Sequence, residues 1–168
     1  MIAQIVVSAA QVVTGATRTF VAKHSVSRST TEGVATTPDG REVWMGFSDG
    51  GAVRVIDGQN GSVLATLNGF LLPQRITISP DGKRAVITDF DCEVVQVADV
   101  ATRRLIGPIA GLEGAGVAKV LPDSRVAIVL LLDEEVLAMV DLQTRRVIAR
   151  HALGGPRPDA AAWGPTPR

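Results

Sequence analysis

A segment of 34 residues occurs three times in this chain, at a spacing of 42 residues and without a gap. The three copies cover residues 33–66, 75–108 and 117–150. A period of about 40 residues built from short apolar runs and turn residues is typical of a propeller blade or a solenoid unit. Five alignment columns hold one residue type or one charge in all three copies: Pro38/Pro80/Pro122, Asp39/Asp81/Asp123, Arg41/Lys83/Arg125, Asp49/Asp91/Asp133 and Asp57/Asp99/Asp141. The repeat predicts an architecture and leaves the function open.

Each copy divides into four short strands, which we name a to d in chain order. Strand a ends at a proline, and Pro-Asp-Gly or Pro-Asp-Ser favours a tight turn into strand b. Strands b and c are apolar on both faces in places, so they need cover on both sides. The predicted strands are 34–37, 42–47, 52–56 and 62–67, then 76–79, 84–89, 94–98 and 104–106, then 118–121, 126–132, 136–140 and 146–149. We predict an all-β fold: a β-propeller of four-stranded antiparallel blades with about 42 residues per repeat.

The two ends of the chain match the repeat only in part. Three β-branched or apolar segments near the start fit short strands, and a polar loop at 25–33 follows them. Pro158 and Pro165 have the spacing of Pro73 and Pro80, so a further strand a is expected at 159–163. The early segments are 4–7, 11–13 and 19–22. The predicted organisation is one domain made of the degenerate outer strands of a partial blade (1–32), three full blades (33–74, 75–116 and 117–157) and the first strand of a closing or partial blade (158–168).

Two assemblies fit these ends. Either they join in one sheet and close a four-bladed ring, or the chain is part of a larger ring. A homodimer or further blades would complete the larger ring. Closure of either kind removes exposed sheet edges.

The composition of the chain limits the classes of binding partner and the cellular compartments that we expect. Lys plus Arg equals Asp plus Glu at 17 each, so we expect neither a nucleic acid nor a membrane as partner. The longest apolar run, 126–132, is too short to span a bilayer. Residues 2–13 are fairly apolar but no basic residue precedes them, which does not fit a secretory signal and favours a cytoplasmic protein. The single cysteine, Cys92, excludes an intrachain disulfide and leaves the compartment open.

Three motifs carry a resemblance to a known family. They are the SPDGK turn that begins at Ser79, the V-x-V-x-D endings at Asp57 and Asp99, and G-x-x-P before strand a. Over residues 33–165 the chain resembles the YVTN-type β-propeller repeats of bacterial proteins, relatives of the NHL and quinoprotein-like propellers. No Trp-Asp pair closes strand c, so it does not resemble the WD-repeat branch. Relatives are often exported, which implies a periplasmic or extracellular location as the alternative.

The resemblance implies a ligand-binding face formed by the b–c turns and the d–a loops. Repeated carboxylates around a channel could hold calcium or another divalent cation, which takes six to eight oxygen ligands. The other interpretation, which we favour, is that an Asp repeated in every blade caps a tight turn, so that no cofactor is expected. The residues of this face are Asp49, Asp91, Glu93, Asp133, Glu134 and Glu135, with Arg75, His151 and Arg157 near the d–a loops.

The histidines, the cysteine and the aromatic residues give no strong indication of a functional site. His24 and His151 are the only histidines, and no motif surrounds either of them. The carboxylates beside Cys92 are expected to raise the pKa of its thiol and so to oppose a nucleophilic role. Trp44 and Phe47 are expected to pack within a blade.

The leading hypothesis is a non-catalytic binding or scaffold module for a protein or small ligand. The alternative is a partial propeller enzyme, either a lactonase-like metal-dependent hydrolase or a quinoprotein or haem-linked oxidoreductase.

Overall fold

The computed structural model describes the backbone of residues 2–6, 9–13, 20–25, 31–48 and 50–155, and the side chains of 33–48 and 50–155. The described residues form fifteen strands and no helix. An N-terminal sheet contains β1 (Ile2–Val6), β2 (Ala9–Val13) and β3 (Phe20–Ser25). No helix in the described part of the chain could cross a membrane.

Three four-stranded antiparallel sheets follow, each with its strands in chain order. Blade 1 contains β4 (Thr31–Thr36), β5 (Glu42–Phe47), β6 (Ala52–Asp57) and β7 (Val63–Asn68). Blade 2 contains β8 (Pro73–Ile78), β9 (Arg84–Asp89), β10 (Val94–Asp99) and β11 (Arg104–Ile109). Blade 3 contains β12 (Ala115–Val120), β13 (Val126–Leu131), β14 (Val136–Asp141) and β15 (Arg146–Ala152).

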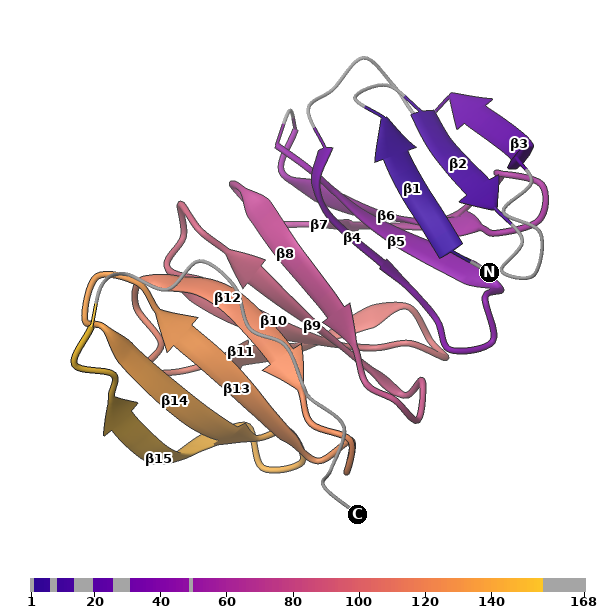
Figure 1. Cartoon of the computed structure of the whole chain (residues 1–168). Coiled ribbons are helices and arrows are strands. Elements are labelled where there is room, and N and C mark those ends of the chain that lie inside the picture. Colours follow the sequence, from indigo (N-terminus) through magenta and orange to yellow (C-terminus); the bar gives the residue numbers. More distant parts are fainter. Residues whose placement is uncertain (1, 7–8, 14–19, 26–30, 49, 156–168) are drawn as a thin grey trace.

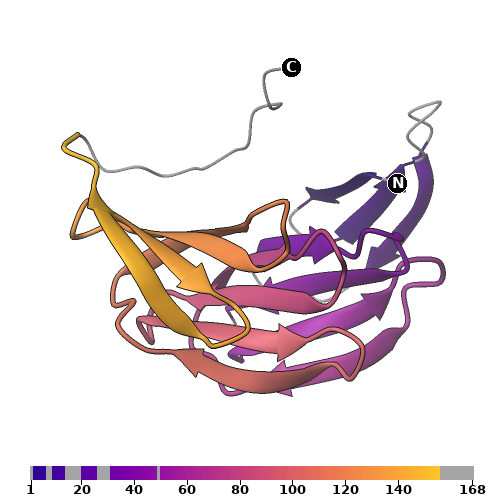
Figure 2. The same cartoon turned by 90° about the horizontal axis from the view of Figure 1, so that it is seen from below.

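The sheets stack face to face along an arc that does not close into a ring (Figure 1). The N-terminal sheet lies at one end of the arc and blade 3 at the other, as the second view also shows (Figure 2). The prediction of an all-β chain with repeated four-stranded antiparallel sheets is confirmed. The expected strand at 159–163 lies outside the described residues.

Observed strands differ from the predicted ones mainly at their ends. Strand a begins three residues early in each blade. In blade 2 it starts at Pro73, and a proline is compatible with the first position of a strand. Strand d of blade 2 continues through Gly107 and Pro108 to Ile109, beyond its predicted end at Ile106. Pro108 is compatible with this place because β11 is the outer edge strand, where one side of the backbone needs no partner.

The tight turns repeat in backbone conformation as well as in sequence. In each blade one residue of every hairpin turn has a φ angle between 53° and 76°. In the b–c turns this residue is Gly51, Glu93 or Glu135, which lie 42 residues apart. Glycine adopts a left-handed conformation without cost, whereas a residue with a Cβ is strained there by roughly 1 kcal/mol. The strand pairing on either side therefore holds Glu93 and Glu135 in place.

The hydrophobic core lies between the blades. Trp44 and Val55 of blade 1 belong with Ile87 of blade 2 to one core cluster, in which these three side chains have no exposed surface. Val97 of blade 2 and Val129 of blade 3 belong to a second cluster of the same kind. Because side chains alternate along a strand, the middle strands bury residues on both faces, as their composition predicts. Trp44 and Phe47 have no exposed surface, which confirms their expected packing role.

Replacing Val129 by Asp is expected to unfold or aggregate the chain. The side chain is fully buried between blades 2 and 3, where a carboxylate would have no partner. Ile148→Asp is the matched control, because Ile148 is 54% exposed on the outer strand and should accept the charge. Thermal unfolding followed by circular dichroism checks both variants. A native-like melting curve for Val129→Asp would contradict the placement of this core.

Candidate binding clefts between the blades

The a–b turns are built around a carboxylate. Oδ1 of Asp39 accepts hydrogen bonds from the Arg41 amide at 3.0 Å and from the Thr37 hydroxyl at 2.6 Å. Asp81 has the same two kinds of partner, and Asp123 accepts two backbone amides. These bonds fix the turn after strand a, and they place the basic residue of the repeated Asp-x-Arg/Lys motif beside it.

The c–d turns use the last residue of strand c in the same way. Oδ1 of Asp99 accepts the amide and the hydroxyl of Thr102, both at 2.9 Å. Its Oδ2 accepts Arg84 of the neighbouring strand at 2.7 Å. Asp57 and Asp141 accept turn amides at the equivalent positions. The repeated aspartates therefore hold both sets of turns on this side of the arc.

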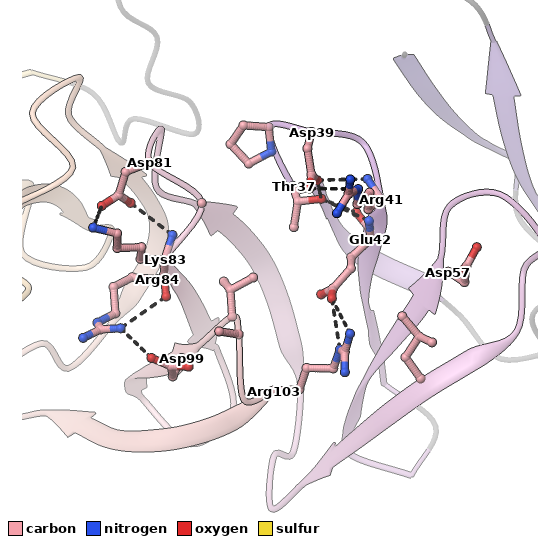
Figure 3. A pocket seen from close by; sticks show the side chains of 15 residues that line it. Thr37, Asp39, Arg41, Glu42, Asp57, Asp81, Lys83, Arg84, Asp99 and Arg103 are labelled. Carbon is pink, nitrogen blue, oxygen red and sulfur yellow. Dashed lines mark hydrogen bonds and ion pairs between the residues drawn. The ribbon is translucent and has the colours of Figure 1, made fainter.

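The two sets of turns enclose a cleft of about 830 Å³ between blades 1 and 2, which we call cleft 1 (Figure 3). It is lined by both turns of each blade, together with the exposed side chains of Leu64 and Ala101. Its volume lies within the usual range for ligand sites, about 300–1,000 Å³. Five acidic and four basic residues line it: Asp39, Glu42, Asp57, Asp81 and Asp99 with Arg41, Lys83, Arg84 and Arg103.

One ion pair crosses cleft 1 from blade to blade. Arg103, in the c–d turn of blade 2, donates from Nε and Nη2 to Oε1 of Glu42 in blade 1, at 3.0 and 2.7 Å. The other oxygen of Glu42 accepts the indole N–H of the buried Trp44 at 3.0 Å. Glu42 thus ties the turn of blade 2 to the core of blade 1 (Figure 3). The pairs Arg41–Asp39, Lys83–Asp81 and Arg84–Asp99, which also line the cleft, each lie within one blade.

A second cleft of the same kind, cleft 2, lies between blades 2 and 3. Its volume is about 400 Å³, and it is lined by the a–b turns of both blades and the c–d turn of blade 3. Asp81, Lys83 and Arg84 line both clefts. The Ser124 hydroxyl accepts the Asp81 amide at 2.9 Å and so joins the two turns. The two clefts are therefore neighbours on one face and share a wall.

The hydrogen bonds of the turns lower the pKa values of carboxylates that line the clefts. The Thr37 hydroxyl is the largest cause for Asp39, and the Thr102 amide is the largest cause for Asp99. Partial burial raises the pKa of Asp81, but the hydrogen bonds of its turn outweigh that effect and the net shift is downward. These groups are ionised at neutral pH, which suits them to holding a ligand and not to donating a proton.

The predicted ligand face, made of b–c turns and d–a loops, is on the opposite side of the arc. Its described residues are exposed and line neither cleft: Asp91, Glu93, Asp133, Glu134, Glu135, Arg75 and His151. Glu134 pairs with Arg150 at 3.1 Å. Asp49 and Arg157 lie outside the described residues, as does the side chain of His24. Within the described side chains, no three His, Cys, Asp or Glu residues are grouped as a metal ion would require.

Asp89 is a polar residue of the b–c side that the sequence did not single out. It is only 2% exposed and accepts the amides of Leu71 and Leu72 at 2.7–3.2 Å, which joins the d–a loop after blade 1 to blade 2. Its repeat equivalents are Phe47 and Leu131, so the signal is a charge in an otherwise apolar column. The same signal, a departure from the repeat, marks Glu42.

Cys92 is exposed, and the pKa of its thiol is raised, as expected. The largest cause is local burial, followed by the Asp89 carboxylate; the adjacent Asp91 contributes less. The direction of the predicted shift is confirmed, and its main causes are different. A thiol with a raised pKa is a poor nucleophile at neutral pH.

Asp99→Ala is expected to destabilise the chain by about 1 kcal/mol, because the c–d turn loses its acceptor for Thr102. The melting temperature should fall by about 2–4 °C for that loss in a chain of this size. Asp99→Asn, which keeps an oxygen at Oδ1, should lose less. An unchanged melting curve for the alanine variant would reject the capping role.

The stability of the chain should fall in acid partly through Asp141. The Thr144 amide, followed by Arg125, lowers its pKa from 3.8 to about 2. The folded state therefore binds this proton less readily than the unfolded chain, so the contribution is complete above the ordinary pKa and disappears as pH falls through the folded value. Urea unfolding between about pH 5 and pH 2 should show a shallower loss of stability for Asp141→Asn than for the natural chain. Identical slopes for both would contradict the shift.

Comparison with known proteins identifies the fold but not a family. No family model matches the chain, and no curated protein matches it. Among solved structures, hydrazine synthase of Kuenenia stuttgartiensis is similar, with a TM-score of 0.77 and 22% sequence identity. The match covers 87% of this chain and 43% of the other, so this chain spans less than half of that protein's length. The likeness shows a shared all-β arrangement of blade-like sheets.

Proposed function

We propose that this chain is a non-catalytic binding module of β-propeller type, related to the YVTN-type repeats, and that it holds an extended protein segment along clefts 1 and 2. The observation that carries the proposal is the repetition of the cleft. Two neighbouring clefts with a common wall suit an elongated occupant better than a compact one. This places the binding face on the side of the a–b and c–d turns, opposite to the face that the sequence suggested.

The charges that line the two clefts support a bound protein segment that carries both acidic and basic side chains. Cleft 1 presents five carboxylates and four basic groups, and cleft 2 presents Asp81 and Asp123 with Lys83, Arg84 and Arg125. Such balance does not attract a polyanion, because nucleic-acid sites depend on a surplus of positive charge. Exposed apolar surface at Leu64 and Ala101 offers contact for a side chain of the occupant.

The lowered pKa values of Asp39, Asp81 and Asp99 support a role as fixed charges that hold a ligand over a role as general acids. A general acid needs a pKa near the working pH, whereas these carboxylates remain ionised and hydrogen-bonded within their turns. The occupant is therefore recognised by fixed charges that need no proton transfer.

The test is an amide chemical-shift titration with the capped tripeptide Ac-Glu-Gly-Arg-NH2, and with Ac-Gly-Gly-Gly-NH2 as the uncharged control. The charged peptide should shift the amides of Lys83, Arg84 and Thr102, and the control should shift them less. Ala101→Trp should weaken binding by about tenfold or more, because the ring fills cleft 1. The matched control is Ala110→Trp, another exposed alanine, in the d–a loop on the opposite side.

Two results would overturn the proposal. If neither peptide shifts these amides, the clefts do not take a polar segment. If Ala110→Trp abolishes binding and Ala101→Trp does not, the ligand face lies on the b–c side.

A further inference from the structure

The N-terminal sheet has the strand pairing of a blade whose strand a is not among the described residues. In β2 and β3, Ala9 pairs with Ser25 and Val13 with Phe20, with a bulge after Val12. The pairing of β6 with β7 is the same residue for residue, because Ala52 pairs with Asn68 and Ile56 with Val63, with a bulge after Val55. The pairing of β1 with β2 likewise repeats that of β5 with β6. β1, β2 and β3 are therefore strands b, c and d.

β1 consequently has an open edge. In the three complete blades strand b pairs with strand c on one side and with strand a on the other. Within the described part of the chain β1 pairs only with β2. An unpaired edge presents a row of N–H and C=O groups, which can accept a further strand.

The other end of the arc has a face that matches a blade interface. On the face of blade 2 that packs against blade 3, four side chains have no exposed surface: Val86, Thr88, Val95 and Val97. Forty-two residues on, blade 3 carries four large apolar side chains at the equivalent positions: Ile128, Leu130, Leu137 and Met139. Three of these four are only half-buried. This face of blade 3 has the composition that buries one blade against the next, and blade 3 lies at the end of the arc (Figure 1).

We propose that a second copy of this chain covers both ends. Its residues 159–163 would pair with the open edge of β1 as strand a, and its N-terminal sheet would pack on the outer face of blade 3, where three of the four apolar side chains are only half-buried. Those residues lie outside the described structure, but Pro158 and Pro165 on either side of them have the spacing of Pro73, the first residue of β8, and Pro80, which follows β8. When two copies exchange this strand, the N-terminal sheet of each becomes a complete four-stranded blade. Closed rings of identical chains remove free edges and are a common form of assembly.

The repeat also sets the register of the joint. Gln4 is equivalent to Ile87, because Gln4 pairs with Gln11 as Ile87 pairs with Gln96. Ile87 pairs with Ile76 of strand a. Ala161 takes the place of Ile76 when Pro158 is aligned with Pro73. Gln4 of one copy should therefore lie directly opposite Ala161 of the other, at a Cα separation that a disulfide can bridge.

The experiment introduces Gln4→Cys and Ala161→Cys together in full-length chain that carries Cys92→Ser. After mild oxidation, a non-reducing gel should show most of the protein as two linked chains. Gln4→Cys with Ala160→Cys is the matched control, because neighbouring residues of a strand point to opposite faces and should not link. One chain has a mass of 17.6 kDa. Light scattering of the natural chain should give twice that mass.

Each other outcome overturns the proposal. A disulfide within a single chain, together with a monomer mass, would mean that each chain closes on itself. A dimer that does not form the disulfide would mean that the copies meet elsewhere, and equal linking of the control pair would remove the predicted register. The gel and the light scattering report only how the chains assemble. Their failure is therefore distinguishable from a failure of the peptide titration, which tests the proposed function.

Discussion

Burial of blade 2 on both of its faces is the constraint on which the structure depends. In β9 the neighbouring residues Val86 and Ile87 are both fully buried, one against blade 3 and the other against blade 1. Full burial of such a side chain contributes about 1.5–3 kcal/mol, and a separate blade would lose it on at least one face. The blades therefore stabilise one another as neighbours in a repeat array.

The same repeat creates the clefts. The Asp residues at the ends of strands a and c are needed to form the turns, and they bring basic neighbours to each junction between blades. A charged and grooved face therefore appears at both junctions between the three complete blades. Departures from the repeat then distinguish one junction from the next. Glu42 is replaced by Arg84 and Val126 in the later blades, so the bridge from Arg103 to Glu42 occurs only at cleft 1.

The proposed binding of a protein segment and the proposed association of two copies are compatible in one ring. Clefts 1 and 2 lie on the face of the a–b and c–d turns, and the proposed exchange would add further junctions on that face. A longer row of clefts suits an extended occupant. The hydrazine synthase structure, of which this chain matches 43%, shows that the same stack of sheets exists within a longer chain.

The sequence by itself determined the strands, the four-stranded repeat and the aspartates that fix the a–b and c–d turns. These features depend on side-chain alternation and on hydrogen bonds between residues two or three positions apart, which a linear pattern contains. Only the tertiary structure decided which side of the arc has the clefts. It also decided that Arg103 reaches Glu42, 61 residues away, and that Asp89 holds a loop 18 residues away. Those contacts join blade 2 to blade 1 or to the loop that follows blade 1, and their geometry depends on how two sheets pack, which no local pattern encodes.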